Sequence, residues 1–177
     1  MTDINVPECH KEHMIQGLIE VLGTIEAFTF LDALHEGGLE PYDLATRGIL
    51  IRGGRAGFNY WLKQNLDLLG WNSLDFRMHP VKNKILNGLQ GIVQQIENDN
   101  GPRVQLVNAP KQWKLTLTPH PDTASHHTDF SCSYLLGFLQ EFCRWAGLGK
   151  FYFVNLQSDL EIEKLPCEIT IRKEPLD

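Results

Sequence analysis

The spacing of apolar residues changes once along the chain, at the polar segment 98–102. Before this segment, apolar side chains recur every three or four residues, which is the period of an α-helix packed on one side. After it, residues 104–106 and 113–117 alternate apolar with polar side chains, as a half-buried strand does. The sequence therefore predicts a helical first half followed by a second half that contains strands.

Four helices are predicted before the change of period. Glycine pairs or single glycines end the first three, and Pro80 suits the first turn of the fourth. The four expected helices run from Glu12 to Gly37-Gly38, from Asp43 to Ile51, from Arg55 to Gly70, and onward from Pro80.

A β-hairpin, a helix and two further strands are predicted in the second half. The helix runs from Phe130 to Ala146 with Asp129 as its N-cap, and the last strands cover 151–156 and 167–171. Hairpins rather than regular crossovers predict an α+β fold, with helices packed on a twisted antiparallel sheet. We expect a flexible lead-in at residues 1–11 and a single domain over residues 12–177.

The charge and the cysteines limit the classes of function. The chain has 16 Lys and Arg against 22 Asp and Glu, a net charge of -6, which argues against a nucleic-acid backbone as its main partner. We expect no membrane span, because no apolar run approaches the roughly 20 residues that a span needs. Four irregularly spaced cysteines and a start unlike a signal peptide predict a cytoplasmic protein with reduced thiols.

The glycine-rich segment Arg52-Gly53-Gly54-Arg55-Ala56-Gly57 has two interpretations. It could cradle a phosphate, although it lacks the spacing and the Lys-Ser/Thr ending of a P-loop. We favour a tight junction between helices, in which Gly57 allows close packing.

Three groups of residues could carry metal or nucleophile chemistry. Cys9, His10 and His13 lie near the start, where a polar terminus is the simpler interpretation. Cys132 and Cys167 have two interpretations. If the last strand packs under the helix, they could form a tetrahedral zinc site together with one or two imidazoles. Alternatively, both are buried core residues. Candidate imidazoles belong to His126 and His127. No pattern typical of a catalytic nucleophile surrounds Cys132 or Cys143.

Aromatic residues are expected to converge where the helices meet the sheet. They form either a closed aromatic core or an apolar pocket for a flat, hydrocarbon-like ligand. The candidate ligand-binding residues are Phe58, Trp61, Trp113, Tyr134, Phe138 and Phe142.

Four segments of the last fifty residues resemble the 4-vinyl reductase, or hydrocarbon-binding, domain family. The glycine-rich segment 52–57, followed by an amphipathic helix, is similar to the middle of that family. The resembling segments are Ser131-Cys132-Ser133-Tyr134-Leu135-Leu136-Gly137-Phe138-Leu139, Trp145-Ala146-Gly147, Phe151-Tyr152-Phe153-Val154 and Leu165-Pro166-Cys167-Glu168-Ile169.

The resemblance implies a dimeric fold shared with vesicle-transport (TRAPP) subunits and with haem nitric-oxide-binding domains. It also implies binding of an apolar or tetrapyrrole ligand, with Trp113 as the positional candidate for an aromatic contact. Haem is not expected, because the axial His and its anion-binding partners are missing.

Many family members hold a structural zinc, so the resemblance also implies a metal site. Cys132 and Cys167 match the first and last of its ligands, but residues 154–158 stand where an acid and a further Cys are expected. Zinc would therefore require His126, His127 or Asp159 as substitute ligands.

Two functions follow as expectations. The first is non-catalytic binding of an apolar aromatic, hydrocarbon or tetrapyrrole-like molecule by a stand-alone homodimer. The second is an assembly or scaffold protein, for example in photosynthetic-pigment or complex biogenesis, with a closed core and a surface for a protein partner. A reductase is not favoured, because the chain has no dinucleotide fingerprint.

Overall fold

The fold is α+β, as the sequence predicts. A computed structural model describes residues 8–35, 44–98, 102–119, 131–157 and 166–176. Its helices and strands, in chain order, are α1 (Glu8–Leu22), α2 (Thr24–His35), α3 (Leu44–Asn65), α4 (Leu74–Met78), α5 (Val81–Asn98), β1 (Arg103–Asn108), β2 (Gln112–Thr118), α6 (Cys132–Ala146), β3 (Tyr152–Gln157) and β4 (Cys167–Pro175).

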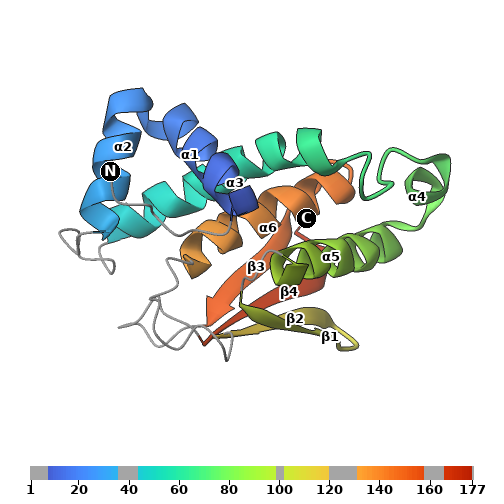
Figure 1. The fold of residues 1–177 in the computed structure, drawn as a ribbon. Coiled ribbons are helices and arrows are strands. Elements are labelled where there is room, and N and C mark those ends of the chain that lie inside the picture. Colours follow the sequence, from blue (N-terminus) through green and yellow to red (C-terminus); the bar gives the residue numbers. More distant parts are fainter. Residues whose placement is uncertain (1–7, 36–43, 99–101, 120–130, 158–165, 177) are drawn as a thin grey trace.

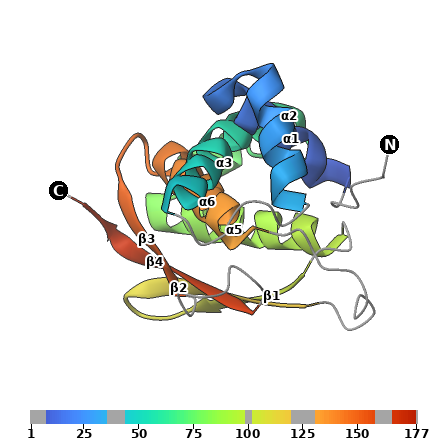
Figure 2. The ribbon, with the colours of Figure 1, turned by 90° about the vertical axis from the view of Figure 1, so that its left-hand side faces the viewer.

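The helices are stacked in layers on one side of the sheet (Figures 1 and 2). Helices α5 and α6 lie next to the strands, α3 packs on α6, and α1 and α2 lie farthest from the sheet. The apolar stripe predicted for the fourth helix faces the core in α5, where Ile85, Leu89, Ile92 and Ile96 are buried. The described core is therefore continuous from the sheet to α1.

The four strands form one antiparallel sheet in the order β1-β2-β4-β3. Buried and less buried side chains alternate along β2, which confirms a hairpin with one wet face. On that face the Lys114 ammonium lies 2.5 Å from the Glu168 carboxylate of the neighbouring strand. Strand β3 forms one edge of the sheet and β1 the other.

Helix α3 continues through Gly53-Gly54, where the sequence led us to expect a break between two helices. The glycines instead provide room between helices. A Cβ atom on Gly54 would lie 2.0 Å from the Tyr134 carbonyl oxygen of α6, and one on Gly137 would lie 1.9 Å from the Ile51 carbonyl oxygen. The expectation of close packing is confirmed, but the expected helix boundary is wrong, because tertiary contact stabilises glycine inside a helix that propensity alone would break.

Other boundaries also differ from the predicted ones. Gly23, at φ 89°, divides the expected first helix into α1 and α2. Helix α1 begins at Glu8, inside the expected lead-in, and residues 1–7 lie outside the described part. The short α4 was not predicted, so five helices rather than four precede β1 among the described residues. Ser131, rather than Asp129, caps α6 by accepting a hydrogen bond from the Tyr134 N–H at 3.1 Å.

Cys132 and Cys167 form a disulfide bond, which corrects the expectation of reduced thiols at these two positions. The bond joins the first residue of α6 to the first residue of β4 across 35 positions of the chain, with the Cα atoms 6.7 Å apart. Both residues are buried, as expected for core cysteines. The sequence could not show the bond, because it depends on the packing of β4 under α6.

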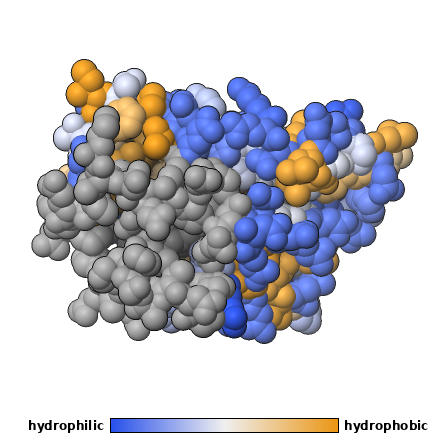
Figure 3. All heavy atoms as spheres, viewed as in Figure 1, coloured by the Kyte–Doolittle hydropathy of each residue, from blue (hydrophilic) through white to orange (hydrophobic). Residues whose placement is uncertain are grey.

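Apolar side chains gather at several places on the face shown in Figure 3, and two of them lie at opposite ends of this face. One lies over α1 and α2, where Ile25 and Phe28 are exposed, and the other lies at the α4 end, where Leu74 and Met78 are exposed. None of the described helices is long and apolar enough to cross a membrane.

The glycine contact between α3 and α6 predicts a large effect of one methyl group. Gly54→Ala should lower the free energy of unfolding by about 2 kcal/mol or more, because the new Cβ meets a backbone oxygen that cannot rotate away. Gly48→Ala, in the same helix with open space around it, should raise that free energy by about 0.5–1 kcal/mol. Urea denaturation of both variants measures the difference, and equal effects would contradict the contact.

The disulfide predicts a stability that depends on the redox state. Closing a loop of 35 positions should contribute about 3–4 kcal/mol, so reductant should lower the stability of the wild-type chain by that amount. The double variant Cys132→Ala/Cys167→Ala should be less stable and should not respond to reductant. Alkylation of the unfolded, unreduced protein should label two cysteines, and labelling of all four would contradict the bond.

Candidate functional site

Four of the six predicted ligand-binding residues meet in one place. Phe58 and Trp61 of α3 pack on Phe138 and Phe142 of α6, and we call these four the inner aromatic cluster. The ring centroids of Phe58 and Phe138 are 5.2 Å apart and those of Trp61 and Phe138 are 5.3 Å apart, both edge to face. All four side chains are at most 2% exposed, so the cluster is part of the packed core.

The other two predicted residues lie elsewhere in the core. Trp113 is buried on β2, with the Lys173 ammonium 5.4 Å from the centre of its ring. The Tyr134 hydroxyl lies beside Gly57 and has no hydrogen-bond partner among the described residues. Burial raises the pKa of Tyr134, so this phenol stays protonated. Both belong to the same continuous core, but among the described residues neither ring forms an aromatic pair with the inner aromatic cluster.

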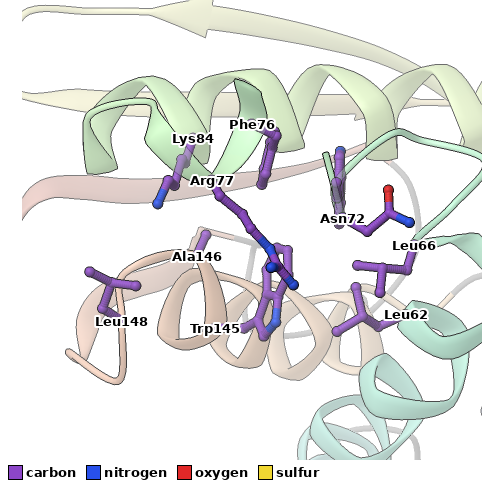
Figure 4. A pocket seen from close by; sticks show the side chains of 10 residues that line it. Leu62, Leu66, Asn72, Phe76, Arg77, Lys84, Trp145, Ala146 and Leu148 are labelled. Atoms are coloured by element: carbon purple, nitrogen blue, oxygen red, sulfur yellow. The ribbon is translucent and has the colours of Figure 1, made fainter. Parts of the chain in front are cut away.

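A pocket of about 250 Å³ lies beside this cluster, at the end of the molecule that carries α4 (Figure 4). We call it the α4 pocket. Leu62 of α3 and Leu66 line one side, and Ala146 and Leu148 line the other. Phe76, Arg77 and Lys84 reach it from α4 and α5, and Trp71, Asn72 and Trp145 complete the lining.

Three aromatic rings form the wall of the α4 pocket. The planes of Trp71 and Phe76 differ by 12°, those of Trp71 and Trp145 by 27°, and those of Phe76 and Trp145 by 20°. Their centroids are 5.5 to 6.1 Å apart. We call these three residues the outer aromatic wall. The wall packs on the inner aromatic cluster, since the ring centroid of Trp71 lies 5.6 Å from that of Trp61 and 5.6 Å from that of Phe142.

Short-range sequence features hold the wall in place. Gly70, at φ 67°, allows the turn after α3, and the Trp71 N–H then donates to the Leu66 carbonyl at 3.0 Å. The Ser73 hydroxyl accepts from the Phe76 N–H at 3.2 Å and so begins α4. Gly91 of α5 leaves space for the Trp71 indole, which would lie 3.4 Å from a Cβ there.

Leu148 lines the pocket in an unfavourable backbone conformation. Its φ is 59°, the only positive value of a non-glycine residue in the described part, and its side chain is 75% exposed. The left-handed region costs a residue with a Cβ about 1–2 kcal/mol, and glycines stand on both sides of it. Leucine at this position therefore lowers stability while adding apolar surface to the pocket rim.

The proposed zinc ligands do not form a metal site in this structure. Cys132 and Cys167 are bonded to each other, so neither sulfur is a thiolate, and His126, His127 and Asp159 lie outside the described residues. Within the described ranges, no three His, Cys, Asp or Glu side chains gather in a way that could hold a metal ion.

The first predicted metal group is likewise not assembled by the described residues. His13 of α1 is buried, its Nδ1 has no hydrogen-bond partner in the described part, and burial lowers its pKa. The side chains of Cys9 and His10 lie outside that part. Cys143 is free but fully buried, and burial raises the pKa of its thiol, which keeps it protonated and unreactive.

Sequence reasoning missed most of the α4 pocket. The sequence predicts no helix or strand between Gly70 and Pro80, and so it gives no reason to select Trp71, Phe76 or Arg77 as site residues. Two signals were available, a Ser73 N-cap three residues before Phe76 and the turn-forming Gly70. What they could not show is that Trp145, at the far end of another helix, stacks on these rings.

Comparison with known proteins adds no family assignment. No protein-family model matches the chain, and no curated protein is significantly similar to it.

The conformation of Leu148 predicts a stabilising substitution. Leu148→Gly should raise the free energy of unfolding by about 1 kcal/mol, because glycine adopts a positive φ without steric cost. The control Lys150→Gly, at an exposed residue without a positive φ, should lower stability by about 0.5–1 kcal/mol. Thermal denaturation tests this, and a lower melting temperature for Leu148→Gly would contradict the assignment of strain.

Proposed function

We propose that this protein binds an apolar one- or two-ring small molecule in the α4 pocket, without transforming it. The observation that carries the proposal is the outer aromatic wall, in which Trp145 lines the pocket and is only half-buried, so that a further ring can stack on it. Small-molecule sites are concave and mostly apolar with a few polar groups, and Asn72, Arg77 and Lys84 are the polar residues of this one.

The size of the pocket favours a small ligand. A volume of about 250 Å³ is below the roughly 300–1,000 Å³ of typical sites for drug-sized molecules, so one or two fused rings fit better than a tetrapyrrole. The inner aromatic cluster supports the wall from behind and has no surface to offer to a ligand, since its members are at most 2% exposed. We therefore place the ligand against Trp145, the least buried ring of the outer aromatic wall, since Trp71 and Phe76 are 4% and 9% exposed.

Membership of the hydrocarbon-binding family is part of the same proposal. It would agree with an apolar ligand and with a homodimer. A cytoplasmic location also remains a prediction, and the disulfide weighs against it, because such bonds are rare in reducing compartments.

A scaffold protein is the second candidate, and a different surface favours it. A groove of about 550 Å³ lies along β3, an edge strand, where Phe151 is 62% exposed and Phe153 is 41% exposed. Exposed aromatic side chains at a sheet edge are typical of surfaces that bind another chain. This surface would serve a second copy or another protein partner and does not need the α4 pocket.

Ligand binding can be tested with a neutral two-ring probe, 1-naphthaleneacetamide. We expect saturable binding to the wild-type chain by calorimetry, with quenching of tryptophan fluorescence. Leu62→Trp should weaken binding at least tenfold, because the larger side chain fills the pocket from α3.

Leu68→Trp is the matched control, since Leu68 is 75% exposed and does not line the α4 pocket. It should bind the probe as the wild type does, and circular dichroism should show both variants folded. Equal binding by wild type and Leu62→Trp would place the probe elsewhere and contradict the proposal.

A further inference from the structure

We propose that the natural ligand of the α4 pocket is an aromatic carboxylate, whose negative charge is held by Arg77 and Lys84. This inference rests on the proposed function and specifies the chemical class of its ligand. Its basis is the charge of the pocket, which the aromatic wall by itself does not determine.

The side chains of Arg77 and Lys84 have no ion pair or hydrogen bond within the described part of the chain, and no acidic residue is among those that line the pocket. Three other cations of the described part do pair with an acid: Lys82 with Glu174, Lys114 with Glu168 and Arg144 with Glu141. In a chain of net charge -6, two unpaired cations in one apolar pocket create a local positive potential that attracts an anion.

Arg77 and Lys84 reach the pocket from the side of α4 and α5, and Trp145, Ala146 and Leu148 face them from α6 and the turn after it (Figure 4). Arg77 extends from α4 toward Trp145 of α6, and Lys84 points from α5 toward the end of the pocket that Leu148 lines. Leu62 and Leu66 face the pocket from the opposite end. A ligand whose ring lies on the wall and whose acid group faces α4 and α5 would contact both kinds of surface.

A carboxylate suits this pair of cations better than a neutral polar group. The planar guanidinium of Arg77 can donate two parallel hydrogen bonds to one carboxylate, and the Lys84 ammonium adds a second positive charge. The Asn72 amide, which also lines the pocket, already donates to the carboxylate of Asp67. The Asn72 amide is therefore already engaged, which leaves Arg77 and Lys84 as the lining groups that can bind the acid group of a ligand.

The test compares two probes of the same shape, 1-naphthaleneacetate and the neutral 1-naphthaleneacetamide, by calorimetry at low ionic strength. We expect the wild-type chain to bind the acid about tenfold more tightly than the amide. This ratio should fall toward one in 0.5 M salt, because the charges lie at a solvent-exposed rim.

Arg77→Gln and Lys84→Gln should each lower the ratio of acid affinity to amide affinity toward one, because each removes one of the two charges that face the acid group. The matched control is Lys82→Gln, which removes the same charge from α5 at a residue paired with Glu174 outside the pocket. It should keep the wild-type ratio. Because Arg77 is exposed and Lys84 lies at the rim, we expect these variants to fold, which circular dichroism verifies.

Each other outcome overturns a defined part of the argument. Equal binding of acid and amide would overturn the carboxylate inference and leave the proposed function standing. A preference for the acid that survives both Arg77→Gln and Lys84→Gln would place the anion elsewhere and overturn the inference as well. If neither probe binds, the proposed function fails, and the inference fails with it.

Discussion

The close contact between α3 and α6 is the constraint on which the rest of the structure depends. At Gly54 and Gly137 the two helices touch through backbone atoms, with less room between them than one methyl group needs. Phe58 and Trp61 follow Gly54 by one and two helical turns, so this contact brings their rings onto α6. The inner aromatic cluster is thus a consequence of glycine packing.

The candidate site continues the same arrangement outward. Trp71 and Trp145 rest on the inner aromatic cluster, and Phe76 stacks on both of them from α4. A rigid core behind the wall keeps the rings in place without a ligand, which lowers the entropic cost of binding. The strained backbone at Leu148 and the unpaired cations lie beside this wall, among the residues that line the pocket.

Most elements of the fold could be predicted from hydrophobic period and turn residues. The helix after Pro80, the hairpin and the helix that ends at Ala146 follow local rules of periodicity and capping. The errors fell where tertiary contact overrides local preference, as at Gly53-Gly54 inside α3, and where an element is short, as in α4. The site was predicted only at its inner side, since aromatic periodicity identifies buried rings but not which of them reach the surface.

The sequence by itself determined the fold class, the buried faces of α5 and β2, and the aromatic content of the core, because each depends on neighbours within a few turns of the chain. Only the tertiary structure decided that Cys132 bonds to Cys167, that Trp145 stacks on Trp71, and that Arg77 and Lys84 share a pocket without an acid. Each of these joins elements far apart in the sequence. The distance in space between such elements is set by how the helices pack on one another and on the sheet, and a local pattern of residues does not determine this packing.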